Sequence, residues 1–209
     1  MSKRNSEYER KENDLYETPE WVTHALIPHI PLRIKTIWEC ACGSGKMVRP
    51  LEAAGFTVIG SDLDLGDDFF QSEVIGESVI AIVTNPPFNL AHKFVDKALD
   101  DTKEFNGFVA MLLPVDYDSA KTRRHQFLDC KAWKKKLVLT RRIKWFDEPV
   151  PCKKCNATGL VDGVKCKPCK GEGEKMVSPS ENHAWYIWDW TNEDNPTIDY
   201  YVESSPKKK

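Results

Sequence analysis

A tetrapeptide in the middle of the chain, Asn85-Pro86-Pro87-Phe88, combines groups that could hold an amine in place for a reaction. Its two prolines fix φ and remove two backbone donors. The turn therefore presents the Asn85 amide oxygen and the Pro86 carbonyl as hydrogen-bond acceptors, with the Phe88 ring as a stacking face. Acceptors placed against the protons of an exocyclic base amine would favour its pyramidal, nucleophilic form. Such a site works by positioning and electrostatics, and it needs no general base.

A second group of residues has the composition of a nucleoside-binding site. Glu39 lies four residues before Gly43, and Gly43 and Gly45 allow tight backbone turns and close approach of a ligand. Asp62 ends the next predicted strand, where a carboxylate can accept hydrogen bonds from two ribose hydroxyls. The sequence lacks the three-glycine fingerprint of pyrophosphate binding, which argues against a dinucleotide cofactor.

Four cysteines form two Cys-x-x-Cys pairs separated by ten residues: Cys152, Cys155, Cys166 and Cys169. Each pair can place two sulfurs on one tetrahedral ion, so the spacing predicts a closed, structural Zn²⁺ site. Free thiols or a redox pair are the alternative. Because this segment has almost no large apolar residues, the metal would supply the free energy that folds it. Cys40, Cys42 and Cys130 are predicted to be small core residues.

The near-neutral net charge of −2 hides an uneven distribution. Residues 121–175 contain 16 Lys and Arg against 6 Asp and Glu, a local charge of +10, and the rest of the chain carries −12. A basic block in an acidic protein is typical of a polyanion-binding surface, although solvated lysines give the same count. Five lysines lie among the cysteines, which favours contact with a nucleic-acid backbone over a purely stabilising knuckle. They are Lys153, Lys154, Lys165, Lys167 and Lys170.

Alternating apolar segments must position these residues. Predicted strands cover residues 36–40, 57–60, 79–84, 107–113, 136–145 and 183–190, and predicted helices cover 19–27, 46–54, 91–99 and 119–133. Thr18 is expected to cap the first helix. Strand-helix alternation with short connections predicts an α/β fold with a mostly parallel sheet flanked by helices. The last two strands would form an antiparallel hairpin interrupted by the cysteine-rich insertion.

These motifs, in this order, resemble the methyltransferases that use S-adenosylmethionine (SAM), above all the DNA N6-adenine enzymes with an Asn-Pro-Pro-Phe motif. The resemblance implies a Rossmann-like class I fold. It implies that Glu39, Gly43 and Gly45 surround the methionine part of SAM and that Asp62 holds the ribose. The remaining cofactor contacts that it implies are Asp68 at the adenine and Tyr16 and Thr18 at the methionine end. Asp64 and Asp67 remain rivals for Asp62 and Asp68.

The resemblance also implies the reaction. Asn85, Pro86, Pro87 and Phe88 would direct a methyl group to N6 of an adenine flipped out of DNA. Phe88 favours nucleic-acid adenine over the protein glutamine of release-factor enzymes, which typically carry Tyr. RNA adenine and a protein amide remain alternatives, as does an inactive scaffold that binds nucleic acid through zinc. The cysteine repeat is similar to the zinc-binding repeat of J-domain chaperones.

The remaining sequence features set the organisation and the setting. Residues 1–148 and 178–209 are expected to form the methyltransferase domain, and residues 149–177 the zinc-binding insertion. The polar start of the chain and the lack of a long apolar stretch predict a cytoplasmic protein with no membrane partner. DNA, or alternatively RNA, is the expected partner. The sequence gives no indication of the oligomeric state.

Overall fold

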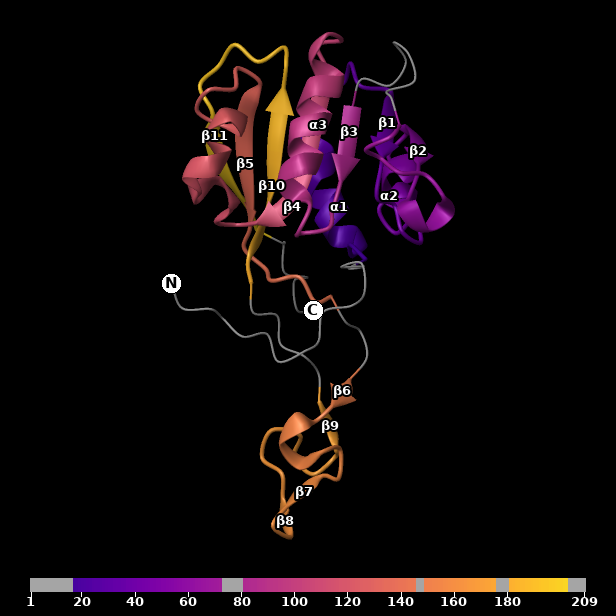
Figure 1. The fold of residues 1–209 in the computed structure, drawn as a ribbon, viewed down its shortest axis with the longest axis vertical. Helices are drawn as coiled ribbons and strands as arrows, with labels where there is room; N and C mark the ends of the chain where they lie inside the picture. Colours follow the sequence, from indigo (N-terminus) through magenta and orange to yellow (C-terminus); the bar gives the residue numbers. More distant parts are fainter. Residues whose placement is uncertain (1–16, 73–80, 146–148, 176–180, 203–209) are drawn as a thin grey trace, which may run out of the picture. The chain divides into compact units, whose positions relative to one another are not determined.

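The computed structural model describes residues 17–72, 81–145, 149–175 and 181–202. These residues fall into two compact units. The sheet unit comprises the described residues between 17 and 143 and residues 181–202, and the cysteine unit comprises the described residues between 144 and 175. Figure 1 shows the elements of both units.

In the sheet unit, the described residues form seven strands in the order β11-β5-β10-β4-β3-β1-β2. β10 is the strand that runs antiparallel to its neighbours, and the other pairings are parallel. The predicted, mostly parallel sheet and the antiparallel pairing of β5 with β10 are therefore confirmed. The strands are β1 (Thr36–Glu39), β2 (Thr57–Gly60), β3 (Ala81–Thr84), β4 (Phe108–Pro114), β5 (Trp133–Leu139), β10 (His183–Asp189) and β11 (Thr197–Tyr201).

The most apolar strands lie in the middle of this sheet. All residues of β3 and β10 are buried, as are all but the last of β4, because helices or coil cover both faces there. The edge strands β2 and β11 are mostly exposed. Burial on both faces explains why the central strands are continuous apolar runs, and this made them easy to recognise in the sequence.

Helices cover both faces of the sheet. In Figure 1, α3 (Ala91–Lys103) lies in front of the strands and α1 (Glu20–Leu26) lies behind them. Trp185 of β10 donates a hydrogen bond to the carbonyl of Val22 in α1, which ties that helix to the sheet. The shorter helices are α2 (Val48–Ala53) and the 3₁₀ turns η2 (Ile27–His29), η3 (Leu63–Leu65), η4 (Tyr117–Ser119) and η5 (Lys121–Gln126). Among the helices in the described part of the chain, none has the length and apolar character needed to cross a bilayer.

Three predictions about local structure were wrong. Residues 119–133 form two 3₁₀ turns and a loop rather than one helix, because Trp188 donates to the Gln126 carbonyl and Phe127 packs against Tyr186. Thr18 does not cap α1: the carbonyl of Pro19 accepts the Val22 N–H at the start of that helix. β5 begins and ends earlier than the predicted strand at 136–145.

The insertion also does not separate the last two strands, because β11 follows β10 at the far edge of the sheet. β11 pairs in parallel with β5, and the alternation of exposed and half-buried residues along it is typical of an edge. Residues 79 and 80 of the predicted third strand lie outside the described residues.

The cysteine unit has two short antiparallel ladders and one 3₁₀ turn. β6 (Val150–Pro151) pairs with β9 (Glu174–Lys175), and β7 (Leu160–Val161) pairs with β8 (Val164–Lys165). The turn η6 (Lys153–Cys155) carries the first cysteine pair towards the second. The four cysteines and Val161 form the small core of this unit.

Candidate functional site

A cavity of about 360 Å³ lies at the carboxyl end of the parallel strands. β1 has β2 on one side and β3 on the other. The connection from β1 to β2 and the connection from β3 to β4 therefore lead towards opposite edges of the sheet. In open α/β sheets, such a switch point opens a crevice in which ligands bind. The loops that follow β1, β2 and β3 all contribute to the wall, and the volume suits a small ligand.

The glycine loop after β1 is held in place by residues that follow β2. The Cys42 N–H donates to the Ser61 carbonyl (3.0 Å), and the Gly43 N–H donates to Oδ2 of Asp62 (2.8 Å). Oδ1 of Asp62 accepts the N–H of Asp64 (2.9 Å). Gly45 has φ +80°, which favours glycine. Asp62 therefore organises the loop, and each of its oxygens keeps a second lone pair for a ligand hydroxyl.

Glu39 is the most deeply buried carboxyl group of the cavity wall, with 1% of its surface exposed. Its Oε1 accepts hydrogen bonds from Oγ1 of Thr84 (2.6 Å) and from the Ala41 N–H (3.2 Å). Burial raises the pKa of Glu39 to about 7; the two hydrogen bonds oppose the rise, and the nearby Asp62 adds to it. A cation bound in the cavity would favour the ionised form of this group.

Three aromatic rings form one part of the wall. Phe69 stacks on Phe94 with the ring centroids 4.8 Å apart, and Phe70 meets Phe94 edge-on at 5.0 Å. Phe70 is partly exposed, whereas Phe69 is buried against Trp38. Aromatic faces of this kind suit a planar heterocycle such as adenine.

The charge of the wall is strongly negative. Among the described residues that line it, six carry carboxyl groups: Glu17, Glu39, Asp62, Asp64, Asp67 and Asp68. Such a wall suits a cationic ligand and repels the pyrophosphate of a dinucleotide. The chemistry of the wall thus agrees with the missing pyrophosphate fingerprint in the sequence.

The predicted acceptor motif lies on the same cavity. Asn85 and Pro87 follow β3 and belong to its wall. Pro86 is buried, and Phe88 is half-buried with its ring stacked on His183 at 5.6 Å between centroids. Burial lowers the pKa of His183 to about 4. The imidazole is therefore neutral at pH 7, and it supports Phe88 as a flat, uncharged ring.

The cavity brings most of the sequence-predicted site residues together. These are Thr18, Glu39, Gly43, Asp62, Asp68, Asn85 and Pro87, and the rivals Asp64 and Asp67 also line it. Gly45, Pro86 and Phe88 are not among the lining residues, but each is next to one of them in the sequence. Tyr16 lies outside the described residues. Asp68 uses its carboxylate to accept the Phe70 N–H and the Gln71 amide.

Among the described residues, the cavity is also lined by residues that sequence reasoning did not assign to a site, among them Glu17, Lys46, Asn89 and Phe94. Lys46 directly follows the glycine loop, and this position is the signal that could have identified it. Phe94 lies on the buried face of α3; it belongs to the core cluster and also lines the cavity.

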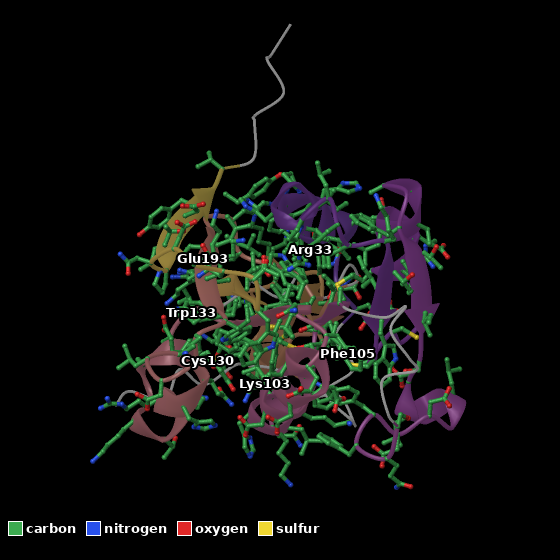
Figure 2. The ribbon with its side chains drawn as sticks, turned by 90° about the horizontal axis from the view of Figure 1, so that it is seen from above. Arg33, Lys103, Phe105, Cys130, Trp133 and Glu193 are labelled. Carbon is green, nitrogen blue, oxygen red and sulfur yellow. The ribbon has the colours of Figure 1, made fainter. Side chains whose placement is uncertain are left out.

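Figure 2 looks onto the end of the sheet unit at which the parallel strands begin, opposite the cavity. Arg33, Lys103, Trp133 and Glu193 lie there, around the ends of the elements. Arg33 and Lys134 form ion pairs with the buried Asp189, which closes this end of β10. Cys130 is half-buried against the core cluster, as expected for a small core residue.

The four cysteines of the cysteine unit converge on one point. Their sulfurs all lie within 4.8 Å of one another, with Cys152 and Cys166 at 3.8 Å and Cys155 and Cys169 at 3.6 Å. Tetrahedral thiolates at a Zn–S distance of about 2.3 Å lie roughly 3.8 Å apart, so the donor set fits zinc. Gly173 permits this convergence, because a Cβ there would lie 2.3 Å from the Ala157 carbonyl oxygen.

We expect Cys166→Ser to lose the metal and the order of the cysteine unit while the sheet unit still melts cooperatively. The reason is that three thiolates and an alcohol hold zinc poorly, and this unit has little other core. Metal analysis should give about one zinc per wild-type chain and much less in the variant. Cys130→Ser is the matched control, because Cys130 belongs to the sheet unit and is not one of the four converging cysteines. Equal zinc in both variants would contradict the assignment.

No protein-family model and no curated protein matches the sequence. Among solved structures, the chain is similar to a protein from Listeria monocytogenes described as a class I SAM-dependent methyltransferase. The TM-score is 0.55 and the identity 11%, over 93% of this chain and 67% of that one.

Two larger proteins align less well. A modification subunit of a type I restriction enzyme from Vibrio vulnificus gives a TM-score of 0.47 and 14% identity, over 93% of this chain and 48% of that one. A type I restriction-modification methyltransferase subunit from Streptococcus thermophilus gives 0.46 and 12%, over 83% and 44%. The chain therefore spans less than half the length of these two. The likeness to the Listeria protein shows that the chain has the Rossmann-like fold of class I methyltransferases.

Proposed function

We propose that this protein transfers a methyl group from SAM to the N6 amine of adenine in DNA. One observation carries the proposal: Asn85 and Pro87 of the acceptor motif line the same cavity as Glu39, Gly43 and Asp62 of the nucleoside motif. Residues 46 positions apart in the chain thus share one wall, and donor and acceptor would meet there. A reaction between two bound molecules requires such proximity.

The wall supports SAM as the methyl donor. SAM carries a sulfonium and an ammonium, and the six carboxyl groups of the wall favour a cation. Phe70 and Phe94 offer aromatic surface for the adenine ring, and the free lone pairs of Asp62 can accept the ribose hydroxyls. When bound, SAM supplies an electrophilic methyl group, whose bond to sulfur breaks as the bond to nitrogen forms.

The residues after β3 would prepare the amine. The Asn85 side-chain oxygen and the Pro86 carbonyl would each accept a hydrogen bond from the amine, which localises its lone pair towards the methyl group. The extra proton on the methylated nitrogen leaves to water after transfer. The neutral His183 behind Phe88 keeps positive charge away from the acceptor ring. Catalysis by positioning and fixed dipoles accounts for this arrangement.

Nucleic acid as the substrate is supported by exposed lysines of the cysteine unit: Lys153, Lys154, Lys165, Lys167 and Lys170. The basic residues of β5 are less available, because Lys134, Lys135 and Lys136 pair with Asp189, Asp199 and Asp118. A zinc tetrathiolate would itself carry a charge of −2, so the lysines of the cysteine unit also balance their own metal site. The surface available to a polyanion is thus smaller than the sequence count of +10 indicates.

The experiment that tests the proposal incubates the full chain with methyl-labelled SAM and with DNA, RNA or protein extract in parallel. We expect label in DNA, recovered after digestion as N6-methyladenine. Label confined to RNA would identify an RNA adenine enzyme, and label confined to protein would identify an amide methyltransferase. Either result would overturn the DNA assignment while keeping the SAM chemistry. Binding of nucleic acid without SAM binding would reduce the protein to an inactive scaffold.

A further inference from the structure

The cavity has one cation among the described residues that line it, Lys46. Lys46 directly follows the glycine loop and precedes α2. It faces a wall that otherwise carries carboxyl groups and apolar or neutral side chains. A ligand group with negative charge would therefore have one charged partner in this cavity.

Lys46 is already engaged by an acid of the wall. Its Nζ lies 2.8 Å from Oε2 of Glu17, and the two side chains are 38% and 30% exposed. Ion pairs with this exposure contribute little to stability, so Lys46 can exchange Glu17 for another partner at a small cost in free energy. Glu17 lies three residues before α1 and next to Thr18, which also lines the cavity.

The methionine part of SAM ends in an ammonium and a carboxylate. The ammonium suits the acidic wall, but the carboxylate would be repelled by it unless a cation were close. Charge-assisted hydrogen bonds between an ammonium and a carboxylate are among the stronger polar contacts. The carboxylate of Glu17 therefore occupies the position at Lys46 that a ligand carboxylate would need.

We propose that Lys46 binds the carboxylate of the methionine part of SAM and that Glu17 is the counter-ion which this carboxylate displaces. The inference rests on the proposed function and adds two residues that determine which adenosyl ligands bind. Lys46 selects for the amino-acid carboxylate. Glu17 weakens ligand binding by competing for the lysine, and its displacement couples the segment before α1 to occupancy of the cavity.

The test compares two ligands by isothermal titration calorimetry. SAM carries the carboxylate, whereas decarboxylated SAM keeps the adenosine, the sulfonium and the ammonium. We expect Lys46→Met to lower the affinity for SAM by about tenfold or more. The same change should leave the affinity for decarboxylated SAM unchanged or raise it, because this ligand carries two positive charges and the variant removes a positive charge beside it. Glu17→Gln should tighten SAM about two- to fivefold, because the competitor for Lys46 loses its charge.

Lys35→Met serves as the charge-matched control. Lys35 is exposed and directly precedes β1, so it lies at the end of this strand away from the cavity. Its replacement should change neither affinity by more than about twofold. Equal loss of both ligands in Lys46→Met, or weaker SAM binding in Glu17→Gln, would overturn the inference. Melting curves establish whether each variant is folded. If Lys46→Met does not fold, the affinity of Glu17→Gln for SAM still decides the test. A wild-type protein that binds neither ligand would instead overturn the proposed function.

Discussion

Replacing Asn85 by alanine is expected to reduce methyl transfer to about one-hundredth of the wild-type rate or less. Asn85 lines the cavity directly after β3, and its side-chain oxygen is the acceptor that would localise the lone pair of the amine. SAM affinity should stay within a few-fold of wild type, because the nucleoside contacts come from the loops after β1 and β2. Single-turnover rates measured with labelled SAM, together with calorimetric binding, check both halves of this expectation.

Asn85→Asp is the informative companion. A carboxylate keeps an acceptor oxygen at the same distance from the backbone, so this variant should transfer methyl groups faster than Asn85→Ala. If the alanine variant retains the wild-type rate, the acceptor geometry proposed for the motif is incorrect. If SAM binding falls as steeply as the rate in both variants, Asn85 acts on the cofactor rather than on the acceptor.

The sequence was sufficient for the part of the fold that positions the site. β1, β2, β3 and β4 were predicted to within a few residues, because each is a short apolar run bounded by Gly, Pro or polar residues. The strands that carry the site end where these breaks occur. Local composition therefore specified both the strands and the loops that follow them.

The errors arose where tertiary contacts decide the local structure. The segment at 119–133 has a helical pattern of apolar residues, yet the packing of Phe127 on Tyr186 and Trp133 selects short turns. β11 alternates polar and apolar residues without a continuous run, and it becomes a strand because the edge of β5 is available for pairing. Neither cause is visible in a window of sequence.

The candidate site shows the same division. The roles of Asp62 and Glu39 followed from their places at the ends of strands. The bond from the Gly43 N–H to Asp62 was not predictable, since it joins loops 19 residues apart. The ion pair between Glu17 and Lys46 was missed for the same reason, because it joins a segment before α1 to a loop after β1.

Replacing Glu39 by glutamine is expected to change how both stability and cofactor affinity depend on pH. The ordinary pKa of this side chain is 4.5, and burial raises it to about 7 in the folded protein. Between these values the folded state holds a proton that the unfolded state has lost. Stability from this group is therefore complete below pH 4.5 and is lost as the pH rises through 7. The loss amounts to about 3 kcal/mol at most, since one pKa unit corresponds to about 1.4 kcal/mol.

Glutamine cannot ionise, and its amide oxygen can still accept the hydrogen bonds from Thr84 and Ala41. Denaturant unfolding at several pH values should therefore show the wild type losing up to about 3 kcal/mol relative to Glu39→Gln between pH 4.5 and pH 8. The comparison uses the difference in slope, because the buried amide of the variant can shift the whole curve. Glu52→Gln, at an exposed position on α2, should run parallel to the wild type.

The same ionisation links Glu39 to the cofactor. A bound sulfonium and ammonium favour the charged carboxylate, so SAM binding to the wild type should release a proton and weaken as the pH falls below 7. Glu39→Gln should bind SAM about tenfold or more weakly at pH 8, with little dependence on pH. Parallel pH profiles for the two proteins would show that Glu39 does not sense the charge of the ligand. A variant that is more stable at pH 8 but binds SAM poorly would mean that Glu39 is kept in the core for binding at the expense of stability.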